Sequence, residues 1–280
     1  MSQLKLSAFA DEYDASFDEQ LSALKDFGIE NIELRHIDEK NISLFEKDEI
    51  TEVKKKLDLF GIKASAVGSP IGKISLDGDI EAHFDMARRV FESANILETK
   101  YVRVFSFYAP KEKSIVDMRD EVFALLERLV VLARKYGVTL CHENEARIYG
   151  DIPERCREIL DGFSGEIKCV FDMGNFVLEG VDPYPEAYEL LKKDIAYFHI
   201  KDALKEGAIV PAGRGDAKIK EILDAHRAYS GEDFFVSLEP HLQSFSGLNA
   251  LVGRSFTNPY QYPDKKIAFA DAVAKFKEII

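Results

Sequence analysis

Short apolar runs alternate with amphipathic helical segments along the whole chain, and the alternation occurs eight times. Most of the runs are rich in β-branched and aromatic residues, which strands prefer. The segments between them repeat apolar residues with a helical period. We therefore predict strands at residues 4–9, 31–37, 63–68, 101–107, 138–144, 167–173, 195–201 and 233–239.

Several helix boundaries are marked by the residues at their ends. Ser16 and Glu19 have the spacing of a capping box, which predicts a helix start there. Gly61 and Gly137 each follow an apolar helical repeat and predict helix ends. The last helix is expected over about residues 264–280.

This rhythm of strand, loop and capped helix predicts the fold class. Parallel strands need helical crossovers between them. Eight such units in 280 residues fit an α/β fold of the closed (β/α)8 type, a TIM barrel, better than an open doubly wound sheet. We expect one barrel domain over residues 1–280, with the long loop 240–263 covering one end.

Charge and hydropathy narrow the range of partners. The net charge is −13 and no basic patch stands out, which disfavours nucleic acid as a partner. No apolar run is long enough to span a membrane, and residues 1–10 do not resemble a secretory signal. We expect a cytoplasmic protein. Cys141 and Cys169 lie in apolar runs, which predicts buried, reduced thiols.

Four consecutive predicted strands end in residues that can bind a metal. Barrel enzymes place their chemistry at these carboxyl ends. Any one of the four has an ordinary explanation, such as a solvated glutamate or a core histidine, but four in register are harder to explain without a ligand. Two glutamates, an aspartate and a histidine suit one divalent ion: Mn²⁺, Mg²⁺ or Co²⁺, with Zn²⁺ possible. The residues are Glu143, Asp172, His199 and Glu239. We expect Glu145, two residues past Glu143, to turn away from the metal.

The strings that carry these residues are LCHENE, FDMGN, YFHIKD and SLEP, and they resemble the xylose-isomerase-like barrel superfamily. The strings SAFADEYDASFDEQL and VPAGRGD resemble its sugar phosphate isomerase/epimerase branch. The resemblance covers essentially the whole chain. It implies that the four residues ligate the metal, and that Glu143 and Glu239 also act as an acid/base pair, as in the ketose 3-epimerases of this group.

The resemblance and the strand ends also suggest substrate-binding residues. A residue matching Arg214 contacts the substrate in those epimerases, whereas Asn175 stands where they have a histidine. Lys201 shares a strand end with His199, and His241 follows Glu239 by two residues. Phe107, at the end of another strand, is expected to form an apolar wall over a sugar ring.

These residues predict an enzyme that acts on a small carbohydrate. The expected function is a metal-dependent isomerase or epimerase of a sugar, sugar phosphate or polyol-derived ketone, which moves protons through an enediolate. A metal-dependent lyase or dehydratase of keto-sugars, keto-inositols or 3-keto glycosides would use the same groups, and a non-catalytic sugar-binding barrel is the third possibility. An apurinic-site endonuclease would need extra histidines that the chain lacks at residues 68–69 and 106–107. A homodimer or homotetramer is also expected.

Overall fold

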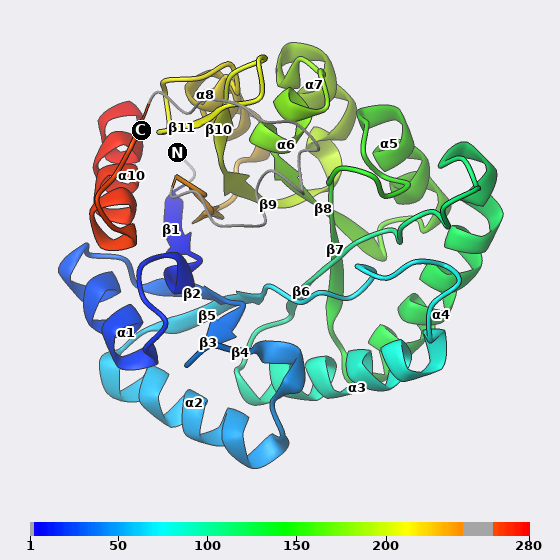
Figure 1. The fold of residues 1–280 in the computed structure, drawn as a ribbon, viewed down its shortest axis with the longest axis horizontal. Helices are drawn as coiled ribbons and strands as arrows, with labels where there is room; N and C mark the ends of the chain where they lie inside the picture. Colours follow the sequence, from blue (N-terminus) through cyan, green and yellow to red (C-terminus); the bar gives the residue numbers. More distant parts are fainter. Residues whose placement is uncertain (1–2, 243–259) are drawn as a thin grey trace.

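The computed structural model describes residues 3–242 and 260–280. Its centre is an eight-stranded parallel sheet in the order β1-β12-β9-β8-β7-β6-β5-β2, which curls into a nearly closed barrel (Figure 1). The Asn31 side chain of β2 donates a hydrogen bond to the Leu6 carbonyl of β1 at 3.1 Å, where the two ends of the sheet meet. All eight predicted strands are confirmed: β1 (Leu4–Ala8), β2 (Asn31–Leu34), β5 (Lys63–Val67), β6 (Tyr101–Val104), β7 (Thr139–Glu143), β8 (Ile167–Asp172), β9 (Ile195–Ile200) and β12 (Phe234–Leu238).

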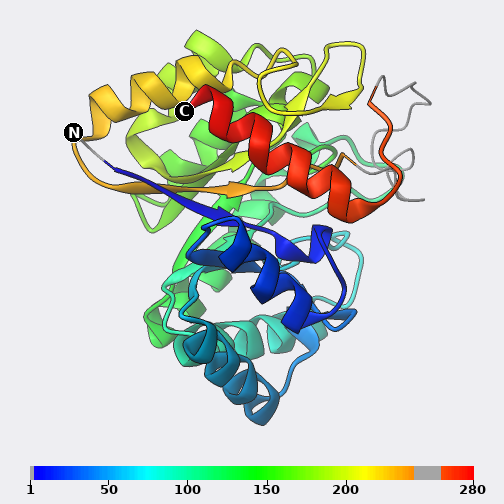
Figure 2. The ribbon, with the colours of Figure 1, turned by 90° about the vertical axis from the view of Figure 1, so that its left-hand side faces the viewer.

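Helices surround the barrel as an outer ring, and α10 lies beside β1 (Figures 1 and 2). They are α1 (Phe17–Asp26), α2 (Lys47–Phe60), α3 (Ile80–Ile96), α4 (Arg119–Tyr136), α5 (Pro153–Gly162), α6 (Met173–Leu178), α7 (Tyr188–Leu191), α8 (Ile219–Ser230) and α10 (Lys265–Ile279). Short helical turns are η1 (Ala10–Glu12), η2 (Ile42–Leu44), η3 (Val116–Met118), η4 (Pro183–Ala187) and η5 (Lys192–Asp194). Two small hairpins pair β3 (His36–Ile37) with β4 (Lys40–Asn41) and β10 (Asp202–Ala203) with β11 (Ile209–Val210). Among the described residues, no helix combines the length and apolar character that a membrane span requires.

Helix ends with strong local signals lie where the sequence predicts them. Gly61 and Gly137 cap α2 and α4 in the left-handed conformation, with φ of 70° and 68°. The Asp264 side chain caps α10 by accepting a hydrogen bond from the Ile267 backbone N–H at 2.9 Å. Most of the expected loop 240–263 lies outside the described residues.

The capping box at Ser16 was wrong, although α1 does begin after this residue. The Ser16 side chain makes no capping hydrogen bond. The first helical N–H, on Phe17, donates instead to Asp38 at 2.9 Å, so a carboxylate distant in sequence takes over the capping role. Helix α3 was not located from the sequence, although Asp79 caps it through the Ala82 N–H at 3.0 Å.

Strand alternation separates two apolar layers. Ile32 and Leu34 of β2 face the helices as part of the main core, whereas Glu33 between them faces the barrel interior. A smaller cluster fills the interior, and it consists of Ala66, Cys141, Val170 and Tyr197. The residues two positions further along three of these strands are Glu143, Asp172 and His199. The barrel therefore changes from an apolar interior to a charged one as it approaches the carboxyl ends. All three cysteines are free and buried, as predicted for Cys141 and Cys169.

Candidate metal centre

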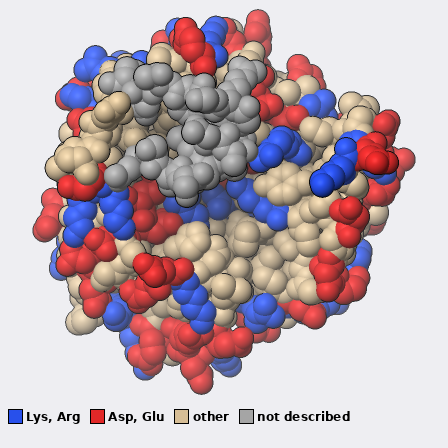
Figure 3. All heavy atoms as spheres, in the orientation of Figure 1, with Lys and Arg blue, Asp and Glu red and all other residues tan. Residues whose placement is uncertain are grey.

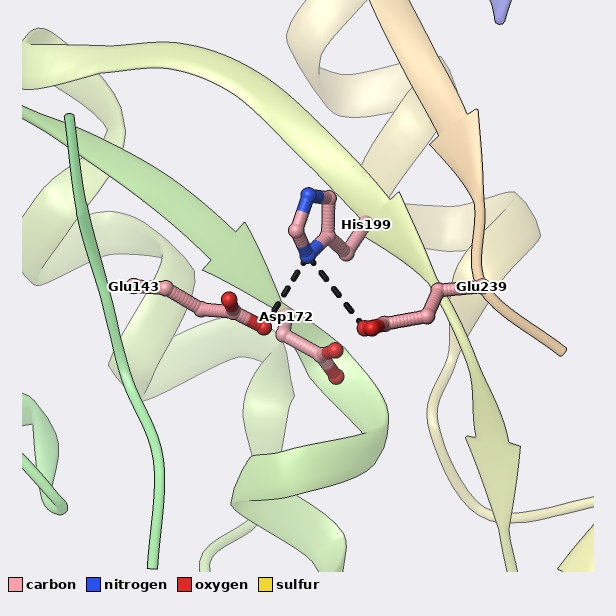
Figure 4. Close-up of side chains that lie close together, drawn as sticks. All are labelled: Glu143, Asp172, His199 and Glu239. Atoms are coloured by element: carbon pink, nitrogen blue, oxygen red, sulfur yellow. Dashed lines mark hydrogen bonds and ion pairs between the residues drawn. The ribbon is translucent and has the colours of Figure 1, made fainter. Parts of the chain in front are cut away.

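Four side chains from four neighbouring strands converge at the carboxyl end of the barrel (Figure 4). Glu143 ends β7, Asp172 ends β8, His199 lies one residue before the end of β9, and Glu239 follows β12 directly. Asp172 and His199 are also paired in register between β8 and β9. Each side chain offers one nitrogen or oxygen atom, and these four atoms lie within 4.8 Å of one another. The structure thus brings together all four predicted ligands.

His199 lies between two glutamates of this cluster. Its Nδ1 lies 2.9 Å from Glu143 Oε1 and 3.5 Å from Glu239 Oε2 (Figure 4). Its other ring nitrogen, Nε2, lies 3.1 Å from Glu33 Oε2. Both His199 and Glu33 are fully buried. The imidazole therefore turns Nδ1 toward the cluster and Nε2 toward the opposite wall of the barrel.

Three cations lie beside the carboxylates of this cluster. Lys201 was predicted as a site residue, whereas Arg35 and Arg103 were not. Lys201 Nζ lies 3.1 Å from Asp172 Oδ2 and 3.3 Å from Glu239 Oε2. Arg103 Nη1 lies 3.2 Å from Glu143 Oε2 and 3.7 Å from Glu239 Oε1. Arg35 Nη1 lies 2.8 Å from Glu239 Oε1. The cluster is thus held in a shell of opposite charge.

The charges shift the acid–base properties of the cluster in different directions. Burial raises the pKa of Glu143, but the charges of His199 and Arg103 outweigh it and hold the pKa at about 2. Burial raises the pKa of Asp172 to about 7, although the Lys201 ammonium opposes the shift. Burial lowers the pKa of His199, but the charges of Glu143 and Glu33 raise it well above its usual value. The surroundings therefore favour the charged form of Glu143, whereas burial favours the neutral form of Asp172.

The donor set fits a divalent cation. Oε2 of Glu143 and Oε2 of Glu239 are buried and lie 3.2 and 3.3 Å from Arg103 and Lys201, but among the described residues neither oxygen accepts a hydrogen bond. A buried charged oxygen without a hydrogen bond is costly, and a metal ion is one way to satisfy it. Three carboxylates and one imidazole suit Mn²⁺, Mg²⁺, Co²⁺ or Zn²⁺. Glu145 lies outside this ligand group and pairs with Lys73 at 3.1 Å, as expected of a residue turned into the loop.

Three of the predicted substrate-binding residues lie next to the cluster. The Asn175 amide donates to Glu143 Oε1 at 3.4 Å, and its oxygen accepts from Lys201 Nζ at 3.0 Å. His241 Nε2 lies 3.2 Å from Glu12 Oε1 and 3.6 Å from Glu239 Oε1. A cavity of about 700 Å³ opens beside this group, and its polar lining includes Asp11, Glu12, Arg35, His36 and His241.

The other two predicted substrate-binding residues lie elsewhere. Phe107 has no exposed surface and packs in the core, with its ring centroid 6.4 Å from that of His83. Arg214 is exposed. The pKa of Glu278 is lowered first by a hydrogen bond from Lys275 and, to a lesser degree, by the charge of Arg214, which places Arg214 near the end of α10. Glu278 lies roughly 14 Å along α10 from Phe269, the nearest residue of this helix that lines the cavity, at about 1.5 Å per residue.

The glycines around Arg214 serve a structural purpose instead. The backbone N–H groups of Gly213 and Gly215 donate to Asp202 Oδ2 at 2.8 and 2.9 Å. A Cβ atom on Gly215 would lie 2.2 Å from Asp202 Oδ1. The turn therefore wraps around a buried carboxylate, which requires a residue without a side chain.

Two charged side chains at the end of β2, Glu33 and Arg35, contact other parts of the barrel rather than each other. Glu33 contacts His199 and accepts a hydrogen bond from Tyr197 at 3.0 Å. Arg35 binds Glu239 and Asp11, the latter at 2.8 Å. Both residues face partners on other parts of the barrel, because side chains at the end of a strand point into the shared interior rather than toward each other.

The face of the molecule onto which the strands open is hollowed, and basic side chains lie within the hollow (Figure 3).

The family model described as a xylose isomerase-like TIM barrel matches residues 21–251, which is most of the chain. The chain belongs to the xylose isomerase-like TIM barrel family. The family match agrees with the fold and with the resemblance found in the sequence.

Solved structures similar to this member of the xylose isomerase-like family share its fold at low sequence identity. The IolI protein with a bound zinc atom is 17% identical, with a TM-score of 0.74 and coverage of 99% of this chain and 98% of the other. D-psicose 3-epimerase with D-tagatose, from Clostridium cellulolyticum H10, is 13% identical, with a TM-score of 0.74 and 98% coverage of both chains. The probable 3-DHS dehydratase AsbF from Bacillus anthracis is 19% identical, with a TM-score of 0.70 and coverage of 90% and 97%. No curated protein matches the sequence significantly.

Proposed function

We propose that this protein is a divalent-metal-dependent isomerase or epimerase that acts on a sugar, a sugar phosphate or a polyol-derived ketone. The observation that carries the proposal is the placement of Glu143 and Glu239 on either side of His199 Nδ1, at 2.9 and 3.5 Å. The two glutamates come from β7 and β12, which β8 and β9 separate in the sheet. They can therefore approach a small substrate from two sides.

In this mechanism the two glutamates move protons. One carboxylate removes the proton from the carbon next to the substrate carbonyl, and the other returns a proton to the opposite face. Glu143, Asp172, His199 and Glu239 would hold a divalent cation, which would supply Lewis acidity to offset developing negative charge on the substrate. Lys201 and Asn175 lie beside the same carboxylates and would bind substrate oxygens. The cavity beside His241 offers room for the rest of a carbohydrate.

A lyase or dehydratase is the second candidate. The fold of this chain is similar to that of a probable dehydratase as well as to that of an epimerase. The same base could remove the proton, after which the substrate expels a group from the next carbon. Mass spectrometry separates the two candidates, because a dehydratase product is lighter by one water whereas an epimerase product keeps its mass.

The test uses a panel of ketoses, keto-inositols and 3-keto glycosides in D₂O with Mn²⁺-loaded protein. We expect solvent deuterium to enter the product. Glu143→Gln and Glu239→Gln should each lower turnover by about 10²–10⁴-fold, because an amide cannot accept the proton. Glu145→Gln is the matched control. Turnover that needs the metal but incorporates no deuterium would indicate a hydride shift and refute proton transfer by the two carboxylates.

Three further expectations stay predictions beside this one. The first two are a cytoplasmic location and assembly as a homodimer or homotetramer. The third is the identity of the metal, and structures similar to this chain include one with zinc and one with magnesium.

A further inference from the structure

We propose that Glu33 is a positioning residue that determines which nitrogen of His199 faces the metal centre. The inference rests on the proposed function, because it assigns a partner to one of the four proposed ligands. Glu33 lies on β2 and His199 on β9, and β1 and β12 lie between these two strands in the barrel. The Glu33 side chain therefore reaches His199 through the barrel interior.

The contact with Glu33 holds a hydrogen on one nitrogen of the ring. Glu33 Oε2 lies 3.1 Å from His199 Nε2, and a carboxylate accepts hydrogen bonds, so Nε2 carries a hydrogen. A neutral imidazole has only one ring hydrogen. Nδ1 lies among the other proposed ligands, 2.9 Å from Glu143 Oε1, and without a metal it too faces a hydrogen-bond acceptor. A metal ion at this position would need the Nδ1 lone pair, so the one hydrogen of the neutral ring would stay on Nε2, where Glu33 accepts it.

Tyr197 holds Glu33 in place. Its hydroxyl donates to Glu33 Oε1 at 3.0 Å, so both carboxylate oxygens have a donor. Tyr197 precedes His199 by two residues on β9 and points to the same interior. Its ring stacks on Phe235 with centroids 4.3 Å apart, which restricts its movement. Tyr197, Glu33 and His199 thus form a continuous buried chain that ends at the metal centre.

The alternative is that Glu33 merely fills the core. A fully buried carboxylate is a costly filler, because its charge loses the solvation of water. Arg35, which directly follows β2, makes its ion pairs with Asp11, Glu12 and Glu239 instead. A carboxylate that accepts the second N–H of a metal-binding histidine is a common way to orient the ring and raise its basicity, and its loss typically costs 10–100-fold in metal affinity.

Isothermal titration with Mn²⁺ tests the proposal on metal-free protein. Glu33→Gln keeps the shape and an acceptor but loses the charge, and we expect affinity to fall by about 10–100-fold. Tyr197→Phe removes only the hydroxyl and should cause a smaller loss in the same direction. Glu145→Gln, which removes a carboxylate outside the chain, should stay within about twofold of wild type; circular dichroism checks that each variant is folded.

The outcomes separate this inference from the proposed function. Wild-type affinity in both Glu33→Gln and Tyr197→Phe would overturn the role of Glu33 alone. A wild-type protein that binds no Mn²⁺ would overturn the metal-dependent function and the inference with it. If Glu33→Gln fails to fold, Tyr197→Phe and ¹⁵N NMR of the zinc-loaded wild type decide. We expect the His199 hydrogen on Nε2, and finding it on Nδ1 would contradict the proposal.

Discussion

Arg103 Nη1 lies 3.2 Å from Glu143 Oε2, inside the barrel and almost out of reach of solvent. The same nitrogen lies 3.7 Å from Glu239 Oε1, so one guanidinium contacts both proposed acid/base residues. Its ring neighbours are Phe9 and Phe105, each with a centroid 5.0 Å from the guanidinium carbon. An arginine here keeps two close carboxylates ionised without itself being able to take part in proton transfer.

Arg103→Met should therefore destabilise the fold. Removing one partner of a buried ion pair typically costs about 3–5 kcal/mol, and here it takes away the cation beside Glu143 Oε2. Urea unfolding of the metal-free protein measures the difference. Arg119→Met, at an exposed arginine that pairs with Glu158, should change the unfolding free energy by less than about 1 kcal/mol. Equal stability of Arg103→Met and wild type would show that the two glutamates do not depend on this cation.

The turn around Asp202 gives a second prediction. Gly215→Ala places a methyl group against the Asp202 carboxylate, which also accepts hydrogen bonds from Gly213 and Ala217. We expect a loss of about 1–3 kcal/mol in unfolding free energy, as for other overpacked sites. Arg214→Ala is the matched control in the same turn and should change neither stability nor Mn²⁺ affinity. A large loss of metal or substrate binding in Arg214→Ala would restore the role that the sequence suggested for it.

His226 gives a prediction for pH. It is buried against Phe198 and Phe234, with ring centroids 4.9 and 4.8 Å away, and burial lowers its pKa to about 4. The unfolded chain takes up a proton near pH 6.5, whereas the folded protein does not until about pH 4. Stability is therefore fully present above pH 6.5 and falls as the pH drops toward 4.

Between pH 7 and pH 5, the titration of His226 lowers the free energy of unfolding by roughly 2 kcal/mol. Urea unfolding of wild type and His226→Gln at pH 7 and pH 5 measures it. The variant should lose less stability between these two pH values than wild type does. The same loss in both proteins would show that His226 does not titrate in the way its burial implies.

The barrel and the convergence of the four proposed ligand residues could be predicted from the sequence because both follow from local periodicity. Alternation of strand and helix predicts parallel strands, and their carboxyl ends must meet at one end of a barrel. Glu143, Asp172, His199 and Glu239 then fall together without knowledge of any contact. Helix α3 was not predicted, although Phe84, Ala87, Val90 and Phe91 repeat on one of its faces with helical spacing.

The shell around the ligands could not be predicted in the same way. Glu33 and His199 are 166 residues apart, and alternation places both in the interior without saying which partner each meets. Arg103 did carry a signal. It is a charged residue within the apolar run YVRVFSF, and a charge inside such a run needs a partner, as His199 does. Arg214 shows the opposite case, since a motif suggested chemistry where the structure has a turn around Asp202.

Anomalous diffraction from crystals grown with Mn²⁺ tests the central claim most directly. We predict one strong peak per chain, with ligand atoms of Glu143, Asp172, His199 and Glu239 about 2.0–2.6 Å from it. Asp172→Asn should weaken or abolish the peak, because it removes a ligand charge. Manganese bound elsewhere, or no peak while the four side chains keep their positions, would contradict the account.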